Sequence, residues 1–446
     1  MVRVSIRAAH IACAAALVTT ATSARAQPAG ASDGPRVDAD RIEARILSLS
    51  EFGRNPEGGV SRVAFSEADI QGRAYVMSLM REAGLEVRVD PAGNIIGRRE
   101  GTDASLPPIL FGSHIDSVPF GGNYDGDVGV IAAIECAQVL REHGIQTRHP
   151  IEVVVFPDEE GGLTGSRAMI GKLGEGALSE RTHSGLTRRE GIRAIGGDPD
   201  RLAEAERAPG QIAAFMELHI EQGASLDKDD IDIGVVEGIV GIEWWDVTIE
   251  GTANHAGTTP MGSRNDALLA AARYVQAVNE VVTSEPGRQV GTVGRISAEP
   301  GAHNVIPGRV HTSLEIRDLS REVIWSLFER IEARAAAIAE ETGTTFTFTL
   351  LDVSSIPATM DEAVRGVISD AADVLGLSWV SMPSGAGHDA QDMARIAPTG
   401  MLFVPSRDGI SHSPREFTTK DDMASGADVL LRSLLAIDAG ALDERR

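Results

Sequence analysis

The chain has 446 residues, of which 42% are hydrophobic and 24% are charged, and its formal net charge at pH 7 is −24. This length is too great for one small core and predicts two domains, while the composition is that of a globular protein. So strong a negative charge repels phosphate backbones and anionic lipid, which argues against nucleic-acid and membrane-surface partners.

The first 26 residues differ in kind from the rest of the chain. Arg3 and Arg7 precede a mostly apolar stretch over residues 11–21, which leads to the sequence Ala24-Arg25-Ala26. This pattern is typical of a cleavable secretory signal peptide, and the apolar stretch is shorter than the roughly 20 residues of a membrane span. We therefore expect cleavage after Ala26, a periplasmic or secreted protein, and a flexible leader over residues 27–40.

Residues 41–240 and 352–446 are expected to form one α/β domain. Hydrophobic periodicity predicts its helices and strands. The predicted helices cover residues 66–83, 128–142, 361–375 and 420–436, and the predicted strands cover residues 85–89, 94–97, 109–111, 151–156, 212–218 and 401–404. The β-branched run at 151–156 is typical of a strand buried on both faces of a sheet. Residues 175–210 are charged and irregular, and we place no boundaries there.

Residues 241–351 follow a different rhythm. The predicted order is a strand at 243–249, a helix at 265–282, strands near 290–296 and 310–316, a helix at 321–341 and a strand at 345–350. This β-α-β-β-α-β order is that of the ferredoxin-like unit. We therefore expect a second domain inserted into the first.

Four apolar strands each lead into a residue that can ligate a metal ion, namely His114, Glu160, His219 and His412. In open α/β sheets, binding sites form outside the carboxyl ends of the strands. A glycine-rich turn adds Asp125. Three imidazoles and two carboxylates suit Zn²⁺, Mn²⁺ or Co²⁺, but they are too many for one tetrahedral zinc with an open position. Two ions that share a bridging carboxylate would use all five ligands.

Two further carboxylates have expected roles beside these ligands. The period of two along a strand puts His114 and Asp116 on the same face, which suits an imidazole oriented by a carboxylate. Glu159 precedes Glu160 at the end of a buried strand, where a carboxylate beside a metal-bound water can act as the general base. A solvated loop charge is the usual alternative for a Glu-Glu pair, but the buried strand before it favours the catalytic interpretation.

Nine short motifs occur in the order found in one family of hydrolases, over about residues 40–436. The motifs are His114-x-Asp116, Gly-Gly-Asn-x-Asp125-Gly, Asp-Glu159-Glu160-Gly, His219-Ile-Glu-Gln222-Gly, Gly-x-Ala-x-His255-Ala-Gly-x-Thr-Pro-Met, Asn304-Val-Ile-Pro, Arg317-Asp318, Gly-His388-Asp-Ala-Gln and Gly-Ile-Ser-His412-Ser-Pro. Through them the chain resembles the N-carbamoyl-L-amino-acid hydrolase, allantoate amidohydrolase and ureidopropionase group. This group belongs to the dinuclear-metal hydrolases, which also include aminoacylases and carboxypeptidase G.

The resemblance implies a fold and a set of metal ligands. The fold would be a mixed-sheet α/β catalytic domain with an inserted ferredoxin-like domain that acts as a lid and forms a homodimer. His114 and His219 would hold one divalent ion, Glu160 and His412 would hold a second, and Asp125 would bridge them. Asp116 would orient His114, and Glu159 would be the general base.

The resemblance also implies substrate contacts. Arg317 would clamp a substrate carboxylate through its planar guanidinium, and His255 and Asn304, from this chain or its partner, would polarise the scissile carbonyl. Gln222 would lie near the ureido or amide group, and His388 would lie close to the substrate. The residues alone leave alternatives open. Arg317 could form a salt bridge with Asp318 or another acid, and Asn304 could be a turn residue, with the adjacent His303 an equally plausible polar residue of the same loop. His388 and Asp389 could lie behind the metal ligands rather than bind the metal.

The expected activity is cleavage of a C–N bond in an N-carbamoyl or N-acyl L-amino acid or a related ureide. Metal-bound hydroxide would attack the carbonyl, and Glu159 would relay the proton. The alternatives are an exopeptidase or aminoacylase of the same superfamily and a non-catalytic periplasmic binding protein. One departure from the family pattern bears on the substrate: the chain runs from Glu160 through Gly161-Gly162-Leu163-Thr164 to Gly165-Ser166, without the usual insert that carries an Arg-Phe pair. This shorter loop is expected to reshape the substrate pocket.

Overall fold

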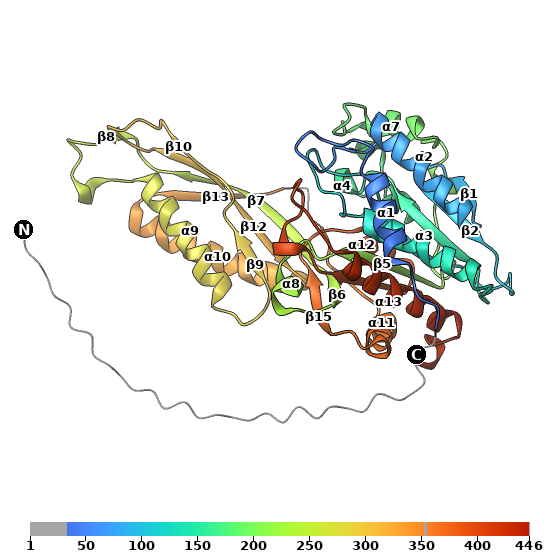
Figure 1. Ribbon diagram of the computed structural model, residues 1–446. Coiled ribbons are helices and arrows are strands. Elements are labelled where there is room, and N and C mark those ends of the chain that lie inside the picture. The colour runs from blue at the N-terminus through green and yellow to red at the C-terminus, as the bar shows by residue number, and fades with distance from the viewer. Residues whose placement is uncertain (1–33, 352–354, 446) are drawn as a thin grey trace, which may run out of the picture. The chain divides into compact units, whose positions relative to one another are not determined.

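The structure is a computed structural model that describes residues 34–351 and 355–445 (Figure 1). The predicted signal peptide and the predicted leader up to residue 33 lie outside the described residues. Helix α1 (Ala39–Leu49) begins inside the expected leader, because the side chain of Asp38 caps it by accepting the N–H of Arg41. The N–H of Val37 donates to Asp428 and that of Asp38 to Glu135, so this end of the leader is hydrogen-bonded to the rest of the chain.

A nine-stranded mixed sheet carries the predicted ligands, in the order β1-β2-β4-β3-β5-β16-β6-β14, with β15 paired to β6. Its strands are β1 (Glu86–Val89), β2 (Ile95–Arg99), β3 (Ile109–His114), β4 (Ile151–Phe156), β5 (Ala214–Ile220), β6 (Ile233–Ile239), β14 (Ala358–Thr359), β15 (Trp379–Ser384) and β16 (Thr399–Val404). The central strands β4, β3, β5 and β16 run parallel to their neighbours, whereas β2 and β6 pair antiparallel with this parallel core. The expected α/β class is confirmed.

The central strands are apolar throughout because both faces of the sheet are covered. Every residue of β3, β4, β5 and β16 is buried. Side chains such as Phe111 and Val153 join one apolar cluster, while their neighbours Leu110 and Val154 join another on the opposite face.

Different helices cover the two faces of the sheet. The first cluster includes side chains of α1, α2 (Glu67–Glu82), α3 (Asp127–Glu142), α11 (Glu362–Leu375) and α13 (Lys420–Asp438). The second includes side chains of α5 (Thr164–Met169), α8 (Ser225–Asp229) and α12 (Asp389–Met393). The other described helices of this part are α4 (Glu159–Gly162), α6 (Glu175–Ser179) and α7 (Arg188–Ala194). Each of the two sets of helices therefore buries one side of the same strands.

Residues 241–351 form a separate five-stranded sheet with its own core. Its strands are β7 (Gly241–Glu250), β9 (Val290–Thr292), β10 (Ile296–Glu299), β12 (Arg309–Asp318) and β13 (Thr345–Leu350), and its helices are α9 (Ala267–Thr283) and α10 (Arg321–Thr342). The order is β10-β12-β7-β13, β9 pairs with β12, and all pairings are antiparallel. The two helices lie side by side against one face (Figure 1), where Trp245 and Tyr274 belong to the apolar cluster. The ferredoxin-like assignment and the lid role stay predictions.

Three strands of the large sheet were not predicted from the sequence: β6, β15 and the two-residue β14. Strand β6 contains Gly234 and Gly238, and β15 contains Pro383, so neither shows the uninterrupted apolar run of β4. Glycine and proline usually mark turns, and here their strands lie towards the end of the sheet rather than at its centre. Within the described residues, we find no helix with both the length and the apolarity to cross a membrane.

Candidate metal centre

The five predicted ligands meet at one edge of the large sheet. His114 ends β3, His219 lies near the end of β5, and Glu160 lies in α4 directly after β4. Asp125 lies in the turn before α3, and His412 lies in the loop that follows β16. Because β3, β4, β5 and β16 are parallel neighbours, their carboxyl ends lie at the same edge, as expected for a site in an open sheet.

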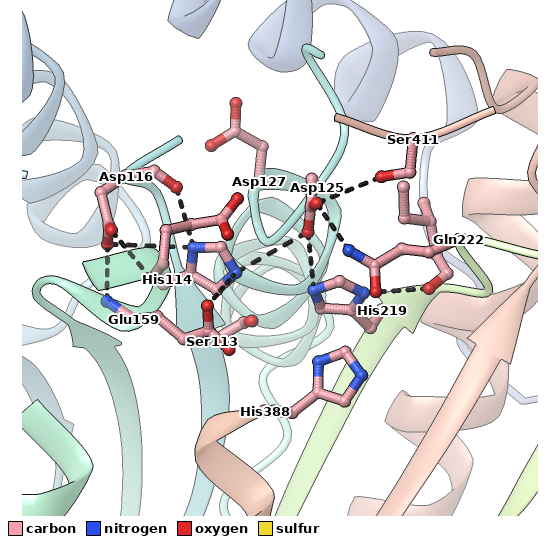
Figure 2. A network of polar contacts seen from close by, with 12 residues as sticks. Ser113, His114, Asp116, Asp125, Asp127, Glu159, His219, Gln222, His388 and Ser411 are labelled. Atoms are coloured by element: carbon pink, nitrogen blue, oxygen red, sulfur yellow. Dashed lines mark hydrogen bonds and ion pairs between the residues drawn. The ribbon is translucent and has the colours of Figure 1, made fainter. Parts of the chain in front are cut away.

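Asp125 belongs to two groups of potential ligands. His114, Asp125 and His219 form one group, and Asp125, Glu160 and His412 form the other, each with ligand atoms within 4.8 Å of one another. Figure 2 shows His114 and His219 directed toward Asp125. The structure thus brings together all five residues, in the two groups that the resemblance implied.

The two carboxylate oxygens of Asp125 face different histidines. Oδ1 lies 3.0 Å from Nε2 of His219 and 3.8 Å from Nε2 of His114. Oδ2 lies 3.1 Å from Nε2 of His412, which is also 3.4 Å from Oε1 of Glu160. This division of oxygens is the arrangement that a carboxylate needs to bridge two ions.

Hydrogen bonds to the backbone fix the rings of the two buried histidines. Nδ1 of His114 lies 2.9 Å from the carbonyl oxygen of Asp116, and Nδ1 of His219 lies 2.9 Å from that of Ile220. A carbonyl only accepts, so each Nδ1 carries the proton and each Nε2 presents a lone pair to the centre. This is the tautomer in which a histidine binds a metal ion through Nε2.

Asp116 contacts His114 through its backbone rather than its side chain. Its carboxylate oxygen Oδ1 is 3.8 Å from Nδ1 of His114. The carboxylate instead accepts the N–H groups of Glu159 (3.2 Å) and Glu160 (3.3 Å). Asp116 therefore connects the end of β3 to the turn that carries the two glutamates.

Three buried polar atoms at this edge fit a bound cation. When the rings are neutral and carry their proton on Nδ1, Nε2 of His114, Nε2 of His219 and Oε1 of Glu160 have no hydrogen-bond partner, although both histidines are at most 1% exposed. Leaving such groups unsatisfied is costly, and cations held at the two ligand groups would satisfy all three. The donors are two imidazole nitrogens and a carboxylate oxygen, the set that Zn²⁺, Mn²⁺ and Co²⁺ accept.

The pKa values show the same preference for positive charge. Burial opposes the imidazolium form of His219, but the hydrogen bond and the negative charge of Asp125 raise its pKa to about 9. The hydrogen bond to Asp125 likewise raises the pKa of His412 to about 9. Burial lowers the pKa of His114 to about 4, so this ring stays neutral. The negative charge of Asp125 thus favours positive charge on the side chains next to it.

Glu159 lies at the same cavity as the ligands. The cavity has a volume of about 210 Å³ and is lined by Asp125, Glu159, Glu160, Leu163, His219, Gln222, Ala386, Gly387, His388 and His412. Burial and then the neighbouring charge of Glu160 raise the pKa of Glu159 well above its ordinary value. A raised pKa makes a carboxylate a stronger proton acceptor.

The family model of peptidase family M20/M25/M40 matches residues 110–436. The chain belongs to this family. Hydrolases of the M20 family use divalent metal ions, in agreement with the two ligand groups that share Asp125.

Three similar proteins narrow the position of the chain within the M20 family. The N-carbamoyl-L-amino acid amidohydrolase of Geobacillus stearothermophilus is 44% identical over 409 residues, which are 91% of this chain and 100% of that protein. The allantoate amidohydrolase of Bacillus subtilis is 36% identical and covers 86% of this chain and 93% of its own length. An amidase of the hydantoinase/carbamoylase family from Burkholderia multivorans has a TM-score of 0.82 at 36% identity, over 90% of this chain and 98% of that one. The resemblance inferred from the motifs is confirmed, and the chain is a hydrolase.

Gln222 and His388 lie at the cavity of this M20 hydrolase without belonging to either ligand group. Nε2 of Gln222 donates a 2.7 Å hydrogen bond to Oδ2 of Asp125. Nε2 of His388 lies 2.9 Å from the hydroxyl oxygen of Ser384, and its ring centre is 4.5 Å from that of His219. Burial lowers the pKa of His388 well below its ordinary value, so it is a neutral side chain beside the ligands.

His255 and Asn304 lie next to each other in the inserted segment. Strand β8 (Asn254–His255) pairs with β11 (Val305–Ile306), and the N–H of Ala256 donates to the carbonyl of Asn304. His255 is exposed, and its Nδ1 accepts the N–H of Gly257. Among the described residues, those that line the 210 Å³ cavity include neither His255, Asn304 nor Arg317.

Arg317 forms an ion pair with an acidic residue, which was one of the two interpretations of this residue from the sequence. Its Nε donates to Oε1 of Glu315 at 2.7 Å, so the partner is Glu315 and not the adjacent Asp318. Its Nη1 donates to the carbonyl of Gly385 at 2.7 Å. Gly385 immediately precedes Ala386, which lines the cavity.

The turn that carries Glu159 and Glu160 is held by residues that were not predicted from the sequence. Asp158 is buried with φ of 57°, and its carboxylate accepts Nε of Arg188 at 2.8 Å and the hydroxyl of Thr164 at 2.5 Å. Arg188 also donates to the carbonyl of Gly161 at 3.0 Å. Arg188 comes from the irregular segment for which no boundaries were predicted, so no local pattern indicated this contact. Glu416, which accepts hydrogen bonds from Tyr124 and Ser411 beside the ligands, was not predicted either.

Proposed function

We propose that the chain is a metal-dependent amidohydrolase that cleaves a C–N bond of an N-carbamoyl or N-acyl L-amino acid or a related ureide. The observation that carries the proposal is the position of Glu159 at the cavity of two ligand groups that share Asp125. The 44% identity to an N-carbamoyl-L-amino acid amidohydrolase over that protein's whole length supports this substrate class.

The proposed cofactors are two divalent ions, Zn²⁺, Mn²⁺ or Co²⁺. His114, Asp125 and His219 would hold one ion, and Asp125, Glu160 and His412 would hold the other. When bound, such ions supply Lewis-acid chemistry: they polarise the substrate carbonyl and lower the pKa of water.

The chain's own residues account for the movement of the proton. Glu159 takes a proton from the attacking water, whose oxygen forms the new bond to the carbonyl carbon. The C–N bond then breaks, and Glu159 returns the proton to the departing nitrogen. The raised pKa of Glu159 favours the protonated form that must exist between these two steps.

The proposed substrate contacts come from both parts of the chain. Gln222 and His388 line the cavity and would meet the ureido or amide group. Arg317 would bind the substrate carboxylate, because a planar guanidinium and a carboxylate match in geometry. To do so it would give up its present hydrogen bonds to Glu315 and Gly385. We further propose that the inserted segment serves as a lid and as the contact of a homodimer, through which His255 and Asn304 reach the scissile carbonyl.

A second cavity offers room for the substrate side chain. It has a volume of about 520 Å³ and shares Gln222 and Ala386 with the cavity at the ligands. Ile231, Val380 and Met382 form an apolar part of its lining, which also contains the charged residues Glu221, Asp229 and Arg288. Because apolar surface favours an apolar occupant, we propose that the preferred substrates carry a sizeable apolar side chain, unlike allantoate, which has polar ureido groups at this position.

Export completes the proposal. The charged start, the apolar stretch and the Ala24-Arg25-Ala26 sequence support a protein that acts in the periplasm or outside the cell, with its amino terminus at Gln27. N-terminal sequencing of the protein recovered from the periplasmic fraction tests this part. A first residue of Gln27 is expected, and an intact Met1 in the cytoplasmic fraction would contradict it.

The experiment that tests the activity measures ammonia and free amino acid from purified enzyme loaded with Mn²⁺, Co²⁺ or Zn²⁺. The substrates are N-carbamoyl-L-methionine, N-carbamoylglycine, N-acetyl-L-methionine, allantoate and a dipeptide. We expect equal amounts of ammonia and methionine from N-carbamoyl-L-methionine. Turnover of the dipeptide alone would identify an exopeptidase, and ligand binding without turnover of any compound would identify a binding protein.

A further inference from the structure

Glu416 lies between the two loops that bring Asp125 and His412 together. It follows His412 by four residues, before α13 begins, and it is 3% exposed. It belongs to neither ligand group and does not line the cavity at the ligands, so it has no direct contact with substrate in the proposed reaction.

One carboxylate of Glu416 holds both loops. Its Oε1 accepts the backbone N–H groups of Tyr124 at 2.8 Å and of Asp125 at 3.0 Å. Its Oε2 accepts the hydroxyl of Ser411 at 2.9 Å and the backbone N–H of His412 at 3.3 Å. Each oxygen therefore serves one loop, and the two loops lie about 290 residues apart in the sequence.

The backbone at both loops requires such support. His412 has φ of 52°, a left-handed conformation that is uncommon for residues other than glycine, asparagine and aspartate. At the other loop, a Cβ on Gly122 would lie 2.0 Å from Oε1 of Glu416, so only glycine leaves room for the carboxylate. The glycine-rich turn before Asp125 is thus shaped around Glu416.

Burying the carboxyl group of Glu416 beside those of Asp125 and Glu160 costs free energy, which indicates that the hydrogen bonds of Glu416 are needed. Glu416 is only 3% exposed and lies beside the carboxylate of Asp125, so its own carboxylate must be satisfied by hydrogen bonds from the protein. Only a carboxylate has acceptor sites for four donors from two directions, since an amide would turn an NH₂ group toward one pair of N–H donors.

We propose that Glu416 is a positioning residue for the ion held by Asp125, Glu160 and His412: it fixes the distance between Asp125 and His412. This inference rests on the proposed metal-dependent function. His114 and His219 are held through Asp116 and Ile220 instead, so the ion between them depends less on Glu416. Partners behind the ligands typically change metal affinity by about 10- to 100-fold.

The test replaces Glu416 by glutamine and by aspartate and measures bound metal. Glu416→Gln keeps the size but loses acceptors for one loop, and Glu416→Asp keeps the charge but shortens the reach. The matched control is Glu135→Gln, because Glu135 is also fully buried and also accepts a backbone N–H, from Asp38 at 3.0 Å, together with two arginines away from the ligands. Each protein is stripped with a chelator and titrated with Mn²⁺ by calorimetry and elemental analysis.

We expect wild type and Glu135→Gln to bind two ions per chain. In Glu416→Gln the weaker-bound ion should lose about tenfold or more in affinity, with a lower kcat that excess Mn²⁺ partly restores and a KM near that of wild type. Glu416→Asp should lie between the two. If Glu416→Gln does not fold, Ser411→Ala removes one donor to Oε2, together with a longer 3.3 Å bond from the same hydroxyl to Oδ2 of Asp125, and should weaken the same ion by several-fold.

Two outcomes overturn the inference: two ions bound with wild-type affinity in the Glu416 and Ser411 variants, or the same loss of metal in Glu135→Gln. The first outcome would show that Glu416 has no effect on the metal. The second would show that its effect is only a loss of general stability. Failure of the proposed function looks different, because wild type itself would then bind no Mn²⁺ or show no metal-dependent turnover.

Discussion

Nε2 of His219 and Oδ1 of Asp125 face each other across 3.0 Å, although Nδ1 of His219 already donates its proton to a backbone carbonyl. This short approach is favourable when a proton or a metal ion lies between the two atoms. Asp125 also faces His412 with its other oxygen, so this one side chain links both ligand groups.

The variant Asp125→Asn should therefore lose metal from both groups. Asparagine has nearly the same size and can keep one acceptor, but it lacks the charge and the second oxygen that a bridge needs. We expect fewer than one ion per chain by elemental analysis, with an unchanged far-ultraviolet circular dichroism spectrum. Two tightly bound ions in this variant would rule out a bridging role for Asp125.

Glu159→Gln separates catalysis from metal binding. Glu159 lies at the cavity but belongs to neither ligand group, so the variant should keep the fold and both ions. Loss of a general base usually lowers the rate by about 100- to 10,000-fold, and we expect kcat to fall within this range while metal content stays the same. A near-normal kcat would remove Glu159 from the proposed mechanism.

Arg188→Ala should weaken the turn that carries Glu159 and Glu160. The variant leaves the buried carboxylate of Asp158 without its charged partner, and breaking a buried pair in this way costs about 3–5 kcal/mol of unfolding free energy. We expect a clear fall in Tm, a lower kcat and weaker binding of the ion held by Glu160.

The neighbouring Arg189 supplies the control for this prediction. It pairs with Glu175 and Asp200 at the surface, where ion pairs contribute little to stability. Arg189→Ala should leave Tm within about a degree or two of wild type and leave kcat unchanged. Equal effects of the two variants would show that the contact of Arg188 with Asp158 has no special importance.

Met382→Asp tests the proposed site for the substrate side chain. Met382 lines the 520 Å³ cavity, and a carboxylate there would repel an apolar group. Because apolar pockets discriminate by about 1–3 kcal/mol, kcat/KM for N-carbamoyl-L-methionine should fall about tenfold or more. The value for N-carbamoylglycine should change little. An equal fall for both substrates would mean that the cavity does not hold the side chain.

The ligands could be predicted from the sequence because each stands at the end of an apolar strand, in the loop after one or in a glycine-rich turn. His114, His219 and Glu160 needed only the rule that sites form at the carboxyl ends of parallel strands. Arg188 and Glu416 act through contacts with residues 30 and about 290 positions away in the sequence, and neither stands directly at the end of a strand. Such contacts depend on tertiary packing, which periodicity and short motifs do not report.

The fold likewise contains elements that local sequence patterns predicted and elements that they did not. Continuous apolar strands such as β4 and long amphipathic helices such as α10 were predicted within a few residues. Strands β6 and β15 were missed because they contain glycine or proline. For Asp116 the partner was predicted, but the atom that meets the ring of His114 is the backbone carbonyl, because the carboxylate is occupied by Glu159 and Glu160.

The most direct test of a dinuclear amidohydrolase is ammonia release from N-carbamoyl-L-methionine by chelator-stripped enzyme during titration with Mn²⁺. We expect no release without metal and full activity only when both ligand groups that share Asp125 are filled, at two ions per chain. Full activity in the stripped enzyme, or no release at any metal concentration, would contradict it.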